Sequence, residues 1–103
     1  MEETDRRRHA RYPCNARVKI TRGEVTWDAT LHDISASGMY IDTHEPLWVR
    51  TEFSARALFP EALSVTCIVR HVDAGQGMVV EFTELSEESR MNLNHPIWRL
   101  SHP

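Results

Sequence analysis

The sequence is poor in cysteine, in long apolar runs and in net positive charge, and each shortage disfavours a class of protein. Its 103 residues include only two cysteines, Cys14 and Cys67, with no Cys-x-x-Cys pair, which argues against a zinc ribbon or a thioredoxin-like site. No apolar run approaches the roughly 20 residues of a membrane-spanning helix, and the charged N-terminus is unlike a secretory signal. The net charge of -3 disfavours a dedicated nucleic-acid-binding protein. We therefore expect a cytoplasmic, soluble domain with two buried, free thiols.

Signatures of catalysis and of metal binding are also missing. The six histidines are scattered, and no two of them have the spacing of metal ligands. No G-x-S-x-G elbow surrounds Ser35. His32 precedes Asp33, but adjacent residues of a strand point to opposite faces, which argues against an acid–base pair. We expect no enzymatic activity, no catalytic residue, no metal and no cofactor.

Alternation of apolar and polar residues predicts strands through most of the chain. In residues 16–20, Ala16, Val18 and Ile20 share one face, which is the period of a half-buried strand. The other predicted strands cover residues 24–32, 39–42, 49–59, 63–73 and 77–82. Six strands that each have one apolar face favour a small closed antiparallel barrel, because closure removes exposed strand edges. The predicted fold class is therefore all-β.

The two ends of the chain differ from the predicted barrel. Near the C-terminus, Ser86 can cap a helix whose first turn carries Glu87 and Glu88, and Pro96 ends or kinks that helix. Ahead of the first strand, the charged segment has no apolar alternation. We expect a flexible N-terminal arm over residues 1–12 and a single domain, a barrel with a C-terminal helix, over residues 13–103.

Four arginines lie within the predicted arm of this acidic chain: Arg6, Arg7, Arg8 and Arg11. Arg7 and Arg11 have the spacing R-x-x-x-R. A guanidinium presents a planar fork of donors that matches phosphate oxygens and the O6/N7 edge of guanine. Taken alone, the cluster favours a solvated basic arm that touches anionic surfaces without specificity.

A second motif, D-x-S-x-x-G, is formed by Asp33, Ser35 and Gly38 at the end of the second predicted strand. A turn alone explains these residues, because short polar side chains bond nearby backbone and glycine allows a positive φ or a close approach. The Asp33 carboxylate can also accept hydrogen bonds from the N1–H and N2–H₂ edge of guanine. Together, the two motifs suit a guanine nucleotide.

With both motifs, the sequence resembles the PilZ domain, the bacterial receptor domain for cyclic di-GMP. The resemblance covers essentially the whole chain. It rests on RRxxxR, on DxSxxG, and on the strands VRHVD and GMVVEF, the latter leading into a C-terminal helix. It implies a six-stranded antiparallel barrel with a C-terminal helix, no catalysis, and a ligand on the outer surface of the barrel.

The resemblance also implies roles for the motif residues. Arg7 and Arg11 would contact the phosphates and the Hoogsteen edge of guanine. Asp33 and Ser35 would hold the other edge of a guanine, and Gly38 would let the backbone approach closely.

Further residues are candidates for contacts with ligand or partner. An arginine at the position of Arg6 goes, in the family, with binding of cyclic di-GMP as an intercalated dimer. Arg8 and Arg70 are additional candidates for the ligand site, and Arg70 is equally compatible with a solvent-facing position. Trp48 and Trp98 fall in irregular stretches and are candidates for partner contacts, with packing against the barrel as the alternative.

We therefore expect a non-enzymatic receptor that binds cyclic di-GMP and relays the signal to a downstream protein that the sequence does not identify. The alternative is a nucleotide-independent protein-interaction module with a small β-barrel fold, in which the arginines are incidental. An oligonucleotide-binding barrel is disfavoured by the acidic charge and by the lack of aromatic residues suited to stacking bases.

Overall fold

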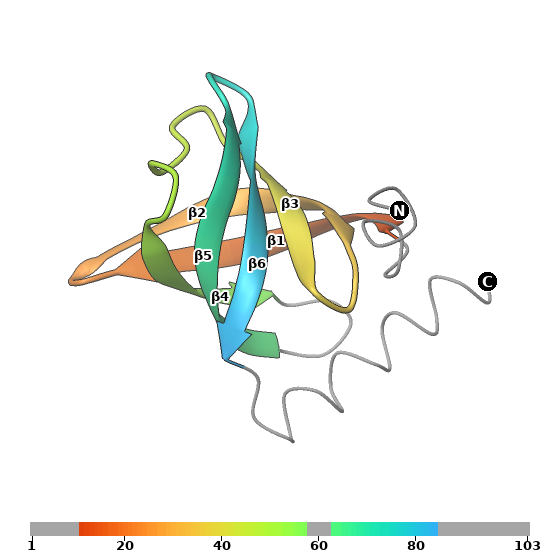
Figure 1. Ribbon diagram of the computed structural model, residues 1–103, viewed down its shortest axis with the longest axis horizontal. Coiled ribbons are helices and arrows are strands. Elements are labelled where there is room, and N and C mark those ends of the chain that lie inside the picture. Colours follow the sequence, from red (N-terminus) through yellow and green to blue (C-terminus); the bar gives the residue numbers. More distant parts are fainter. Residues whose placement is uncertain (1–10, 58–62, 85–103) are drawn as a thin grey trace, which may run out of the picture.

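The computed structural model describes residues 11–57 and 63–84, which form a closed six-stranded antiparallel barrel (Figure 1). The strands are β1 (Tyr12–Arg22), β2 (Val25–Ile34), β3 (Gly38–Asp42), β4 (Glu52–Ala57), β5 (Leu63–Asp73) and β6 (Gly77–Glu84). Their order around the barrel is β1-β2-β3-β6-β5-β4, and pairing of β1 with β4 closes it. The predicted C-terminal helix and most of the predicted arm lie outside the described residues.

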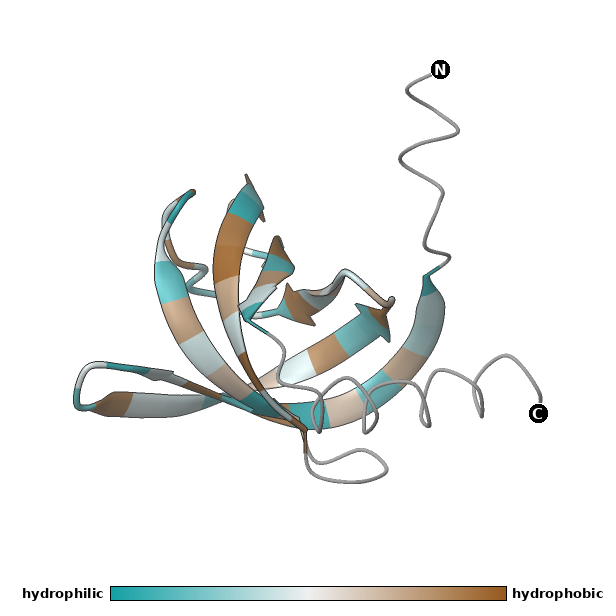
Figure 2. Ribbon diagram, turned by 60° about the horizontal axis from the view of Figure 1, so that its bottom comes forward, coloured by the Kyte–Doolittle hydropathy of each residue, from teal (hydrophilic) through white to brown (hydrophobic). Residues whose placement is uncertain are grey.

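The inward faces of the strands form the core, as the alternation predicted. Apolar and polar bands alternate along the strands in Figure 2. The largest fully buried side chains are Ile20, Leu31, Ile34, Met39, Ile41, Leu63, Met78, Val18, Val69 and Val80. These residues come from five of the six strands, and β4 adds Phe53, Ala55 and Ala57.

Both cysteines are free thiols, but they differ in burial. Cys67 lies in the core, and its burial raises the pKa of the thiol to about 12. Cys14 is only partly buried, and its thiol pKa rises to about 11 through burial and the nearby negative charge of Asp33. The expectation of two buried thiols is therefore confirmed for Cys67 and only partly met by Cys14.

The β1–β2 hairpin extends beyond the strands that would cover its inner face. Val25, which strict alternation places on the same face as the buried Leu31, is 60% exposed. The reason is that β3 pairs with β2 only from Thr30 onward. Trp27, which lies between Val25 and Thr30, is half-buried and packs against the core.

The connection between β3 and β4 corrects the predicted start of the fourth strand. Residues 48–51 form a turn closed by a hydrogen bond from Thr51 N to Trp48 O at 3.1 Å, and Arg50 has a φ of 76°. That φ is incompatible with an extended strand, so β4 begins at Glu52 and not at Val49. Arg50 N bonds to Val69 O at 2.7 Å, which ties the turn to β5. The turn leaves Trp48 85% exposed.

Candidate functional site

An ion pair joins the two sequence motifs. Arg11, immediately ahead of β1, donates from Nη1 to Asp33 Oδ1 in β2 at 2.7 Å. The pairing of Pro13 with Asp33 in adjacent strands brings the two side chains within reach. Both side chains are accessible to solvent, at 43% for Arg11 and 20% for Asp33. The last arginine of R-x-x-x-R and the first residue of D-x-S-x-x-G, which are 22 positions apart, therefore lie side by side.

A bulge in β2 turns Asp33 away from the core. Inward residues alternate along β2 to Leu31, and strict alternation would also bury Asp33. Two consecutive residues of β3 oppose Leu31 and Asp33, so His32 is an extra residue in the ladder. After this bulge Ile34 takes the inward position, at 2% exposure, and Asp33 is released to pair with Arg11. Bulges commonly redirect a side chain in this way.

The same bulge keeps the side chains of both His32 and Asp33 out of the core. Strict alternation would place the two side chains on opposite faces, but at this bulge neither joins the core. His32 lies 3.6 Å from Asp42 Oδ2, and Asp33 pairs with Arg11. Among the described contacts none joins His32 to Asp33.

Ser35 builds the turn between β2 and β3. Ser35 is buried, with 1% of its surface exposed. Its Oγ donates to Gly38 O at 3.2 Å and accepts hydrogen bonds from the backbone N–H groups of Ser37 and Gly38, each at 3.2 Å. The backbone N–H of Ser35 also donates to Gly38 O at 2.8 Å. This network supports the turn-forming interpretation of Ser35.

Gly38 is required by a close approach of two strands. A Cβ at this position would overlap the carbonyl oxygen of Val80 and lie 3.2 Å from Glu81 Cα, both in β6. The positive-φ glycines of the described chain are Gly23 and Gly75, so Gly38 does not need glycine for its φ. The close approach expected at Gly38 is thus made by the backbone of β6.

A second bulge, in β5, lies at Arg70. Val69 and His71 oppose Val80 and Val79, two consecutive residues of β6, and Arg70 is the extra residue between them. Arg70 is exposed, as is His71 after it. Alternation from Val69 already places Arg70 on the outer face, and the bulge keeps His71 out of the core as well.

Arg70 and Arg11 line the same shallow hollow on the outer surface of the barrel. The hollow measures about 230 Å³ and is lined by Arg11, Ser37, Gly38, Arg70, Val79, Val80 and Glu81. Arg70 Nε donates to Glu81 Oε1 at 2.6 Å. Two arginine–carboxylate pairs therefore belong to this region, Arg11–Asp33 and Arg70–Glu81. Val79 and Glu81 were not singled out from the sequence, since only the register of β6 places them here.

The other predicted site residues lie outside the described part of the chain. These are Arg6, Arg7 and Arg8, and the candidate partner contact Trp98 is outside it as well. Within residues 11–57 and 63–84, no cluster of His, Cys, Asp and Glu has the arrangement of a metal site. The same residues include no helix that is long and apolar enough to cross a membrane.

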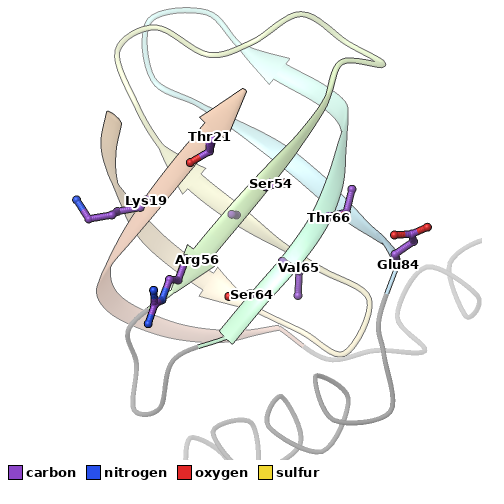
Figure 3. A pocket seen from close by; sticks show the side chains of 9 residues that line it. Lys19, Thr21, Ser54, Arg56, Ser64, Val65, Thr66 and Glu84 are labelled. Carbon is purple, nitrogen blue, oxygen red and sulfur yellow. The ribbon is translucent and has the colours of Figure 1, made fainter. Parts of the chain in front are cut away.

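A hollow of about 340 Å³ lies elsewhere on the barrel, over β1, β4 and β5 (Figure 3). Its side chains include Lys19, Thr21, Ser54, Arg56 and Thr66, and none of them was predicted as a site residue. Lys19 is engaged by Asp28, with Nζ 3.0 Å from Oδ1. This hollow lacks the juxtaposed motifs that mark the hollow between Arg11 and Arg70.

A family model identifies the class of domain to which this barrel and its paired motifs belong. The PilZ domain model matches residues 5–96, so this chain belongs to the PilZ domain family. The matched range contains both the arginine-rich motif and the D-x-S-x-x-G motif. A comparison with curated proteins finds no match.

Solved structures share the fold at low sequence identity. The inhibitor of motility MotI/DgrA from Bacillus subtilis is 20% identical, with a TM-score of 0.78 over 95% of this chain and 53% of that chain. This chain thus spans about half the length of MotI/DgrA. The PilZ domain of YcgR from Escherichia coli, with c-di-GMP, is 18% identical, with a TM-score of 0.76 over 93% and 92% of the two chains. The PilZ domain of CeSA from a cellulose-synthesizing bacterium is 16% identical, with a TM-score of 0.68 over 89% and 98%.

Proposed function

We propose that this chain is a non-enzymatic receptor for cyclic di-GMP, which binds between the N-terminal arginines and the D-x-S-x-x-G turn. The observation that carries the proposal is the Arg11–Asp33 pair at 2.7 Å beside the hollow that Arg11 shares with Arg70. Membership of the PilZ family and the fold shared with the YcgR domain, whose structure contains c-di-GMP, support it.

The described side chains offer complementary groups to a guanine nucleotide. Arg11 and Arg70 provide guanidinium donors for phosphate oxygens or for the O6/N7 edge of the base. Asp33 provides an acceptor for the N1–H and N2–H₂ edge. The partly buried Val79 provides apolar surface in the same hollow. In this proposal the anionic ligand takes over donors that now bond to Asp33 and Glu81.

The arginines ahead of Arg11 complete the proposed site. Arg7 would bind phosphate and guanine with Arg11, and Arg6 would favour an intercalated dimer of the nucleotide, with Arg8 as a further contact. Ordering a segment costs about 1–2 kcal/mol per residue in backbone entropy, which several charge-assisted hydrogen bonds can offset. Binding would then present a new surface to a downstream protein.

Titration calorimetry with cyclic di-GMP tests the proposal. Arg7→Ala and Arg11→Ala should each weaken binding more than tenfold, or by more than about 1.4 kcal/mol, because each variant removes charge-assisted hydrogen bonds. Arg22→Ala is the matched control, since Arg22 is exposed and lies at the opposite end of β1 from Arg11. It should bind like the unmodified chain. A role assigned to Arg7 or Arg11 is wrong if its alanine variant also binds normally.

Absence of binding heat from the unmodified chain would favour the second candidate, a nucleotide-independent protein-interaction module. One observation favours that candidate. Trp48 is 85% exposed on a turn whose backbone bonds to Val69, and exposed tryptophan is enriched at protein interfaces.

A further inference from the structure

One side of β2 has no neighbouring strand near the tip of the hairpin. β2 pairs with β1 as far as Val25, but it pairs with β3 only over Thr30–Ile34. In Figure 1 the β1–β2 hairpin extends well past β3. Residues 25–29 of β2 therefore form a free strand edge within the described structure. An unpaired edge is a template for another extended chain.

The hairpin geometry determines which backbone groups face this edge. Arg22 pairs with Val25 across a two-residue turn, and such a closing pair is hydrogen-bonded. Because bonded and non-bonded pairs alternate, Thr26 and Asp28 direct their N–H and C=O groups away from β1. No backbone partner for these groups is found among the described residues.

A slot of about 620 Å³ runs beside the free edge. Its lining includes Trp27, Asp28 and Ala29 on the β2 side, and Thr43 and Gln76 on the other side. Thr43 N donates to Gln76 O at 2.9 Å, which joins the end of β3 to the turn between β5 and β6. The far wall is thus held by the fold, and the slot is formed before any partner arrives.

The slot is acidic. Asp28, Asp42 and Glu45 are among its lining residues, and the one basic residue among them is His44. The half-buried indole of Trp27 also lines it. Carboxylates together with an indole face attract lysine and arginine side chains, the latter also through cation–π contacts.

Two of the three carboxylates already have basic neighbours. Lys19 Nζ lies 3.0 Å from Asp28 Oδ1, and His32 Nδ1 lies 3.6 Å from Asp42 Oδ2. No cation contacts Glu45 among the described ion pairs. Within the described residues, the slot therefore retains an unpaired negative charge at Glu45.

We propose that this slot binds a basic, extended segment of a partner protein, which adds as a strand to the free edge of β2. Backbone hydrogen bonds to Thr26 and Asp28 would provide affinity, and the carboxylates would select basic side chains, as in other cases of strand addition. A second copy of this chain is a poor occupant, because pairing two β2 edges would bring like-charged slots together. The proposal does not depend on nucleotide binding.

The test uses the full chain and a capped heptapeptide of alternating lysine and valine, with amide hydrogen exchange followed by NMR. In the free protein, Thr26 and Asp28 amides should exchange rapidly. Saturating peptide should slow both at least tenfold, because they become donors to the added strand. A peptide of alternating glutamate and valine should bind at least tenfold more weakly. Protection of both amides in the free protein would overturn the proposal, since the edge would already be covered.

Backbone-methylated peptides separate strand addition from simple charge attraction. An added strand uses the N–H groups of alternate residues, so one of two analogues, N-methylated at the lysines or at the valines, should lose at least tenfold in affinity. Equal binding of both analogues and the parent peptide would overturn strand addition. The double variant Asp42→Asn, Glu45→Gln should weaken binding at least fivefold, whereas Glu52→Gln, an exposed control in β4, should not. A dimer that protects the edge without peptide would overturn the choice of occupant.

Discussion

At the scale of single residues, the sequence identified Asp33 as a candidate site residue but did not predict its orientation. The D-x-S-x-x-G motif marked it as a candidate, and the structure pairs it with Arg11. Its orientation depends on the bulge at His32, which is a shift in the register between β2 and β3. Ser35 differs, since its hydroxyl is buried and bonded to the backbone of its own turn.

Asp33→Ala separates a ligand contact from a structural role. An exposed ion pair is worth about 0.2–1 kcal/mol, so the variant should lose little stability without nucleotide. It should bind cyclic di-GMP more than tenfold more weakly if its carboxylate accepts from guanine. Melting curves with and without nucleotide measure both effects, because the stabilisation by a ligand at fixed concentration increases with its affinity. An equal loss of melting temperature in both conditions would instead identify Asp33 as a part of the turn.

At the scale of elements, alternation predicted all six strands and the closed barrel, because each strand keeps one face in the core. It could not predict the bulges at His32 and Arg70, since a bulge depends on the register between two strands. It also could not predict that the positive φ of Arg50 delays the start of β4 to Glu52. The motif residues were found because their types are informative, whereas Val79 and Glu81 join the site through register alone.

The contact between β3 and β6 makes Gly38 a test of element packing. Gly38→Ala should destabilise the barrel by about 1–3 kcal/mol or more, as overpacking does, because the new Cβ overlaps the backbone of Val80. Urea denaturation measures the loss. The control is Gly23→Asn, in the β1–β2 turn, where the φ is 64° and a Cβ meets nothing within 4 Å. Asparagine tolerates this φ, so the control should stay within about 0.5 kcal/mol of the unmodified chain. Equal stability of both variants would show that β3 and β6 can move apart at Gly38 without a loss of stability.

At the scale of the whole molecule, the chain combines a closed barrel with an arginine-rich segment ahead of it. The net charge of the chain is nevertheless -3. Arg11 joins the arginine-rich segment to the barrel, because its side chain bonds to Asp33 and β1 begins at the next residue. A ligand that binds at Arg11 would therefore act at the junction of barrel and arm. The barrel itself offers little scope for rearrangement, since each strand pairs with two others. This favours a signal carried by the arm and the ligand.

Amide hydrogen exchange across the chain tests that expectation. Amides of residues 7–10 should exchange at least tenfold more slowly with cyclic di-GMP than without it, because Arg7 would then be held by charge-assisted hydrogen bonds. Residues 65–69 are the internal reference, since β5 pairs there with both β4 and β6. They should stay protected in both states. Raising the salt concentration should weaken nucleotide binding and reduce the added protection together, as screening of exposed charges requires. Unchanged exchange in residues 7–10 at saturating nucleotide would mean that the arm does not respond, and that a partner must recognise the bound ligand on an unaltered barrel.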